Sequence, residues 1–250
     1  MPESVVQPEA SAVPLNQVQR VVDTFVAPNK AFSDILRSAS WWLPWLIGVI
    51  VTLGLGAAIQ QKIGWDKSYE NILRQSPAQQ QRFEQMPSDQ QARARSVGMT
   101  VTKDIFWATP VIGLLFAAIA AGVLLASVNF GFGGRAKFGQ MFAVWMYATL
   151  PWSIQGLLGI ITLLIGVDPD SFNLKNFVGT NIGYYMPTDM PQWLIALGTS
   201  IDVFTLWSLV LLTIGCAIIG KIRRGQAGAV VWGWWALITL IKIGSAAIFG

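Results

Sequence analysis

The chain is poor in charge and in the side chains that most enzyme chemistry requires. Charged residues make up 12% of its 250 residues, against about 25% in a soluble globular protein. It has no histidine, the side chain most used for proton transfer near neutral pH and as a metal ligand. Its one cysteine, Cys216, can form neither an internal disulfide nor a cysteine-rich metal site, and we interpret it as a buried small hydrophobe. We therefore predict that the protein is not an enzyme and holds no metal or cofactor.

Long apolar runs take the place of the missing charge. Hydrophobic residues make up 53% of the chain, and five runs are each long enough to cross about 30 Å of hydrocarbon at about 1.5 Å per residue. Pro151, inside the third run, predicts a kink. We predict an all-α integral membrane protein whose membrane domain covers residues 39–250. Its five transmembrane helices cover residues 41–59, 105–130, 141–167, 193–220 and 227–249, and the third and fourth are long enough to tilt or break.

The segment before the first span is polar at first and then amphipathic. Residues 1–14 predict a disordered N-terminus that lacks the basic and apolar regions of a cleavable signal. Residues 15–38 predict short amphipathic helices that lie at the membrane surface or pack on the bundle. Arg20 and Asp23 fall away from the apolar stripe of the first of these helices. That stripe consists of Leu15, Val18, Val21, Val22, Phe25 and Val26.

The basic residues of the short segments predict the orientation of the chain in the membrane. They cluster before span one, between spans two and three, and between spans four and five. Because successive spans cross the membrane in opposite directions, these three segments lie on the same side of it. We predict that this side is the cytoplasm, so that a cell (inner) membrane protein has its N-terminus inside and its C-terminus outside. Residues 60–104 then form an extracytoplasmic loop, although they contain seven basic residues. We expect this loop to be partly helical, because Ser76, Pro77 and Ser88 suit helix starts; a flexible linker is the alternative.

Two charged residues lie inside apolar runs, Asp202 in the fourth and Lys242 in the fifth. Each alone would cost about 2.5–3.5 kcal/mol on insertion scales. Their distances from the outer side coincide on antiparallel continuous helices, so we predict an interhelical ion pair. Two interpretations stay open: a functional site for an ion, proton or headgroup, or a structural seam between helices. Lys242 can also extend outward and leave Asp202 with another partner. The polar neighbours that share the seam are Thr199, Thr205, Thr239 and Ser245.

Small residues recur every four positions in the first two spans. Such spacing lets helices approach closely, either inside one bundle or in a homo-oligomer, and the sequence does not separate the two. The candidate packing residues are Gly48, Thr52 and Gly56 in span one, and Ala118, Gly122 and Ala126 in span two.

Short stretches in a fixed order resemble the YIP family of Ypt/Rab-interacting membrane proteins, in its bacterial multipass branch. They are FVAPNKAFSDI at 25–35, GGRAKFGQMFAVWMYATLP at 133–151, NFVGTNIG at 176–183 and SIDVFTLWSLVLLTIG at 200–215. The resemblance implies a helical five-span domain. Eukaryotic members are associated with small GTPases, vesicle trafficking and membrane shaping. Their DLYGP-like segment has no clear counterpart here, so a GTPase-binding role is not carried over.

Three functions are compatible with these features. Our leading hypothesis is a non-enzymatic protein that organises membrane or partner proteins, as an accessory subunit of an envelope export or transport complex. The runner-up is a small transporter or channel that uses Asp202 and Lys242, and the third is a lipid-handling protein. The expected partners are membrane lipids, other membrane or envelope proteins and a second copy of the chain. The net charge of +4 lies largely beside the membrane, which favours anionic lipid over nucleic acid as its counterpart.

Overall fold

The computed structural model describes residues 14–187 and 190–249, so the predicted disorder at the N-terminus lies almost wholly outside the described residues. The described residues are mainly helical, with no strand among them. Five helical segments are long and apolar enough to cross a membrane, as predicted. They are Trp42–Lys62, Ser88–Phe132, Phe138–Ile165, Val203–Gly220 and Arg224–Ile248.

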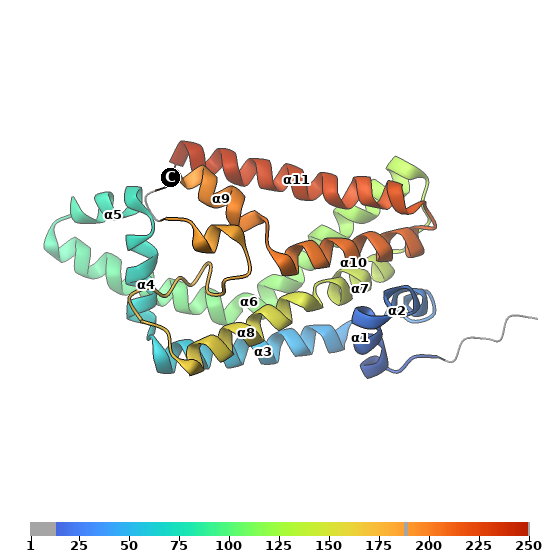
Figure 1. Cartoon of the computed structure of the whole chain (residues 1–250), viewed down its shortest axis with the longest axis horizontal. Helices are drawn as coiled ribbons and strands as arrows, with labels where there is room; N and C mark the ends of the chain where they lie inside the picture. The colour runs from blue at the N-terminus through green and yellow to red at the C-terminus, as the bar shows by residue number, and fades with distance from the viewer. Residues whose placement is uncertain (1–13, 188–189, 250) are drawn as a thin grey trace, which may run out of the picture.

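The helices form a long bundle with a different set of short helices at each end (Figure 1). α1 and α2 lie at the end where α10 connects to α11, and α4 and α5 lie at the opposite end, near the C-terminus. The elements are α1 Gln17–Val26, α2 Pro28–Ile35, α3 Trp42–Lys62, α4 Trp65–Arg74, α5 Pro77–Glu84, α6 Ser88–Phe132, α7 Phe138–Ala148, α8 Leu150–Ile165, the 3₁₀ turn η1 Ile182–Tyr185, α9 Gln192–Ser200, α10 Val203–Gly220 and α11 Arg224–Phe249.

Two hydrophobic clusters hold the bundle together. The larger joins α2, α6, α7, α10 and α11, and includes Phe32, Met141 and Leu212. Cys216 is fully buried within it, which confirms the interpretation of this residue as a small hydrophobe. The smaller cluster joins α3 and α8 to the short helix α4 through Ile59 and Trp65, among others.

Three of the predicted spans differ from single straight helices. Span two is part of α6, which begins at Ser88 because the polar stretch that precedes the apolar run contains no proline after Pro87. Span three is interrupted at Thr149, between α7 and α8, where Pro151 lacks the donor that a continuous helix requires. Span four is interrupted at Ile201 and Asp202, between α9 and α10, because the Asp202 side chain caps α10 instead of continuing α9.

The basic segments gather at one end of the bundle. The Arg224 guanidinium donates to the Asn29 side-chain oxygen at 3.0 Å, and the Arg135 backbone N–H donates to the Gly220 carbonyl at 3.2 Å. The segment before span one and the loops after α6 and α10 therefore lie together, as the alternation of spans requires. We call this the basic end. That it faces the cytoplasm remains a prediction.

The segment between α3 and the apolar part of α6 docks onto the loop that follows α8. The Asn71 side-chain amide donates to the carbonyls of Pro169 and Phe172, both at 2.8 Å. Asp170 forms ion pairs with Lys67 and with Arg74, the second at 3.1 Å. The two segments thus lie side by side at the end opposite the basic end, and that they lie outside the membrane remains a prediction.

The predicted small-residue stripes coincide only in part with the observed contacts. A Cβ atom at Gly56 would lie 2.6 Å from the Trp107 ring, so this glycine lets α3 approach α6. Gly48 and Gly122 have no such neighbour within 4 Å, and Ala126 is exposed. Thr52 and Ala118 are half-buried. The buried face of α6 is rotated by about one residue from the predicted stripe and consists of Ala117, Ala121, Leu124 and Val128.

Candidate functional site

A cavity of about 1010 Å³, lined by both polar and apolar residues, opens between α4, the loop after α8 and the neighbouring ends of the spans. Asp202 and Lys242, predicted from their positions in apolar runs, both line it. Residues from α4, α8, α9, α10 and α11 and from the loop after α8 contribute to its wall. The lining includes Arg74, Gln155, Asp170, Lys175, Asn176, Asn181, Gly183, Thr199, Asp202, Thr205 and Lys242.

Asp202 is held at the N-terminus of α10 by neutral hydrogen-bond donors. One carboxylate oxygen accepts from the backbone N–H groups of Phe204 at 2.9 Å and Thr205 at 3.0 Å. The other oxygen accepts from the Gln155 side-chain amide at 3.2 Å and from the Thr180 hydroxyl. The positive end of the α10 dipole also favours a carboxylate at this position.

Lys242 is held at the C-terminus of α9, whereas Asp202 is held at the N-terminus of α10. Its ammonium donates to the hydroxyls of Thr199 at 2.9 Å and Ser200 at 3.2 Å, in the last turn of α9. The C-terminus of a helix carries negative partial charge and favours a cation. The break in span four therefore gives each charge its own partners, and no ion pair between Asp202 and Lys242 occurs among the described residues.

The other predicted seam residues are distributed unevenly. Thr199 and Thr205 line the cavity with the two charges. Thr239 is buried on α11, and Ser245 is exposed near the end of that helix. Of the described residues, only the first two threonines therefore join Asp202 and Lys242 around the cavity.

A non-helical loop that sequence reasoning did not identify as part of the site forms one wall. Asn176 and Asn181 exchange side-chain hydrogen bonds at 3.3 and 2.7 Å, and the Val203 N–H donates to the Thr180 carbonyl at 3.1 Å. These contacts tie the stretch NFVGTNIG to the start of α10. The signal that could have found it was a pair of asparagines with glycines in a stretch without helical periodicity.

Gly183 allows this loop to pack directly on the α9 backbone. A Cβ atom there would lie 2.6 Å from the Thr199 nitrogen and 3.0 Å from the Ile195 carbonyl oxygen. We expect Gly183→Ala to destabilise the protein by about 1–3 kcal/mol, since backbone atoms must move to admit the methyl group. Thermal unfolding in detergent measures the effect, and Gly244→Ala, where a Cβ meets nothing within 4 Å, is the control. Equal melting temperatures for the two variants would contradict this packing.

The cavity lies far from the basic end. α10 has 18 residues, which is about 27 Å of helix; Arg224 and Lys242 are separated by the same distance along α11. Both charges therefore lie about as far from the basic end as a hydrocarbon core is thick, about 30 Å. Irregular backbone at such a depth is tolerated where it lines a cavity or is covered by protein.

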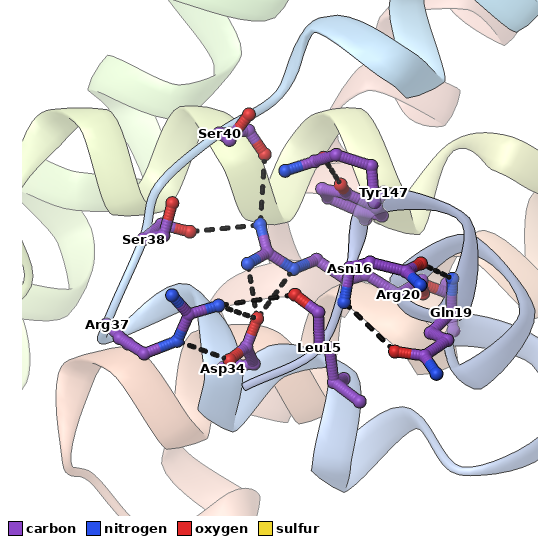
Figure 2. Close-up of polar contacts among 11 residues, drawn as sticks. Leu15, Asn16, Gln19, Arg20, Asp34, Arg37, Ser38, Ser40 and Tyr147 are labelled. Carbon is purple, nitrogen blue, oxygen red and sulfur yellow. Dashed lines mark hydrogen bonds and ion pairs between the residues drawn. The ribbon is translucent and has the colours of Figure 1, made fainter. Parts of the chain in front are cut away.

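A second polar cluster, which sequence reasoning missed, attaches α1 to the bundle (Figure 2). Arg20 is fully buried and forms an ion pair with Asp34, and its guanidinium also donates to the carbonyls of Ser38 at 3.0 Å and Ser40 at 3.2 Å. The same guanidinium lies over the Tyr147 ring, 5.6 Å from its centroid. We call these five residues the N-terminal latch. Arg37 adds two hydrogen bonds to Asp34 from the exposed side.

The latch buries two polar residues of α1. Arg20 and Thr24 are fully buried, whereas Val18, Val22 and Val26 are 65%, 52% and 72% exposed. Phe25, beside these valines, packs edge-on against Trp207 of α10. The apolar stripe of α1 is therefore divided: Leu15 is buried and Val21 and Phe25 pack against the core, whereas the three exposed valines lie on the outside, where lipid is the natural apolar neighbour.

Asp34 links the latch to pH. Burial raises the pKa of its carboxyl, but hydrogen bonds from Arg37 and Arg20 and the charges of both arginines outweigh this, so that its pKa lies below the usual 3.8. A carboxyl with a depressed pKa contributes stability that is complete above its unfolded-state pKa and is lost as the pH falls through its folded-state pKa.

We expect the melting temperature in detergent to hold down to about pH 4 and to fall below it, partly through Asp34. Asp34→Asn should lower the melting temperature at neutral pH and make the acid decline shallower than in the wild type. Melting curves of both proteins between about pH 7 and pH 3 provide the measurement. Parallel curves over this range would show that Asp34 does not contribute.

The comparisons with known proteins concern the chain as a whole. A family model described as the Yip1 domain matches residues 22–245. The chain belongs to the Yip1 family. This match confirms the family resemblance predicted from the short stretches, and it extends from α1 through all five candidate spans into α11. No curated protein and no solved structure matches the chain. The Yip1 match includes both the cavity and almost all of the latch, of which only Arg20 precedes it.

Proposed function

We propose that this Yip1-family protein is a non-catalytic scaffold that holds partner proteins beside the membrane, as an accessory subunit of an envelope export or transport complex. The observation that carries the proposal is the length of α6. Its 45 residues form one continuous helix of about 68 Å, more than twice the thickness of a hydrocarbon core. A continuous helix transmits the position of the bundle to whatever lies at its far end. We place α4, α5 and the start of α6 outside the cell (inner) membrane and the N-terminus in the cytoplasm.

The start of α6 contacts α4 and offers an apolar stripe. Arg95 of α6 forms a half-exposed ion pair with Glu70 of α4, within the arm made of α4, α5 and the start of α6. Val97 and Val101 are 61% and 48% exposed on the same helix, ahead of its apolar run. Exposed apolar residues one turn apart, beside charged and amide side chains, are a suitable surface for a helix of a partner protein.

Affinity purification of the full chain in mild detergent tests the scaffold. The wild type should retain a membrane or envelope protein in stoichiometric amount, and Val97→Glu with Val101→Glu should release it. Gln85→Glu with Gln90→Glu adds the same charge at exposed sites of the same arm and should leave the complex intact. A wild type that is purified alone, or a partner that the valine variant retains, would contradict the proposal.

A transporter is the second candidate, because the cavity contains both intramembrane charges. Toward the basic end, however, α10 continues into the hydrophobic core through Leu209, Leu211, Leu212 and Cys216. Conduction would require this core to open. Proteoliposomes should therefore show no flux that depends on Asp202. A flux that Asp202→Asn abolishes would favour the transporter function over the scaffold function.

A further inference from the structure

The cavity contains two opposite charges that do not neutralise each other. The Asp202 side chain receives only neutral donors although the residue is 4% exposed, and the Lys242 ammonium donates to two neutral hydroxyls. Within residues 14–187 and 190–249, neither has an oppositely charged group within 4.0 Å. Removing a charge from water is costly unless a countercharge accompanies it. A ligand that carries both signs would supply each with the countercharge that it lacks.

The remaining charges of the cavity do not offer the same opportunity. Asp170, at the extramembrane rim, is already paired with Lys67 and Arg74, and these contacts hold the pKa of its carboxyl below the usual value. Lys175, in the loop after α8, is exposed like Lys242, but no hydrogen bond to a described residue holds its ammonium at the cavity. Asp202 and Lys242 are therefore the two charges that hydrogen bonds hold in the cavity wall and that have no countercharge among the described residues.

The architecture around the two charges is suited to binding. The volume of about 1010 Å³ is at the upper end of the range of small-molecule sites, about 300–1,000 Å³. Interrupted helices whose ends point at ligand groups of opposite charge are a recurrent way of building polar sites in membrane proteins. Here the end of α9 and the start of α10 meet at the cavity, with one charged residue at each.

One neutral contact of Asp202 can give way to a ligand. The hydrogen bond from the Gln155 amide, at 3.2 Å, is longer than those from the backbone N–H groups of Phe204 and Thr205, and Gln155 itself lines the cavity. A ligand ammonium in its place would replace a neutral hydrogen bond by a charge-assisted one, which is shorter and stronger. The anionic end of the ligand would then lie toward Lys242, whose ammonium has three donors and two protein acceptors.

We propose that the cavity binds a zwitterion, with its ammonium group at Asp202 and its anionic oxygens at Lys242. Two sources share this chemistry: a free zwitterionic solute and the headgroup of phosphatidylethanolamine. Both can reach a cavity that opens near the boundary of the membrane, away from the basic end. The binding does not depend on the scaffold function, since the apolar stripe of the arm lies on a different element.

The full chain, purified in detergent and depleted of lipid, tests the proposal with defined probes. Soluble glycerophosphoethanolamine should raise the melting temperature in a saturable way. Ethanolamine and glycerol phosphate, which carry one charge sign each, should bind more weakly than glycerophosphoethanolamine by a factor of about ten or more. In nanodiscs, phosphatidylethanolamine should be retained in native mass spectra in preference to phosphatidylglycerol. Binding of the soluble probe assigns a free solute as a source, and retention of the lipid alone assigns the headgroup.

Charge-neutral variants assign the binding to the two residues. Asp202→Asn and Lys242→Gln should each weaken binding about tenfold, and Asp170→Asn, which removes a carboxylate that is already paired, should not. The melting temperature of each unliganded variant shows whether it is folded, and Lys242→Gln carries the test if Asp202→Asn is not. Failure of both probes to bind would overturn the proposal. So would equal binding of a single-charge probe, or unchanged binding by folded Lys242→Gln.

Discussion

Replacing Arg20 with alanine should destabilise the folded protein by about 3 kcal/mol. Removing one member of a buried ion pair costs about 3–5 kcal/mol, because the other charge stays buried without its partner. The lower end applies here, since Arg37 continues to neutralise Asp34. The carbonyls of Ser38 and Ser40 also lose their donor, and the ring of Tyr147 loses its cation.

This loss can be measured as a fall in melting temperature in detergent. At about 2–4 °C per kcal/mol for a domain of this size, we expect a decrease of about 6–12 °C. Arg95→Ala is the matched control, because its ion pair with Glu70 is half exposed, and such pairs contribute about 0–1 kcal/mol. If Arg20→Ala and Arg95→Ala have the same melting temperature, the latch does not hold α1 to the bundle.

Asp202→Ala should destabilise the protein by about 2–4 kcal/mol. The loss of an N-cap costs about 1 kcal/mol, and leaving Gln155 and Thr180 without an acceptor adds about 1–3 kcal/mol. Asp202→Asn should cost much less, because its side-chain oxygen still caps α10 and both neighbours can reorient their polar groups.

The same series tests whether Asp202 and Lys242 act as a pair. A direct buried pair would make Lys242→Met restore part of the stability that Asp202→Ala removes. The separate hydrogen bonds of the two side chains predict additive losses instead. Thermal unfolding of the two single variants and the double variant decides between these outcomes, and clear rescue would show that the charges interact directly.

The spans themselves could be predicted from the sequence, because hydropathy and length determine which segments can leave water. The interruption near Pro151 could also be predicted from its missing backbone donor, although the continuous helix α6 accommodates Pro110. The long continuation of α6 to Ser88 could not. A polar stretch with good helix formers becomes a helix or a linker according to its tertiary contacts, such as those that dock α4 on the loop after α8.

The geometry at Asp202 depended on residues that a pattern along one helix does not include. The break before α10 is stabilised by Gln155 and Thr180, which are 47 and 22 positions away along the chain. The prediction assumed that span four is one continuous helix, which puts Asp202 and Lys242 at the same depth. Both residues do line the same cavity. The assumption also predicted an ion pair between the two residues. That part was wrong because the break creates two helix ends, which bind the charges separately.

Arg20 illustrates a different limit. A helical wheel separates the polar from the apolar side of α1, but it does not say which side faces the protein when lipid can cover the other. Arg20 faces inward because Asp34 and Tyr147, from α2 and α7, provide a charge and a ring at the same place. Only the packing of three elements reveals this arrangement.

Labelling of single cysteines from the two faces of the membrane tests the five-span arrangement most directly. In a Cys216→Ala background, Gln81→Cys lies on α5, and Arg135→Cys and Arg223→Cys lie in the two short basic loops. A membrane-impermeant maleimide should label the first variant in intact spheroplasts and the other two only after the membrane is opened. Labelling of Arg135→Cys and Arg223→Cys from opposite faces would contradict the arrangement.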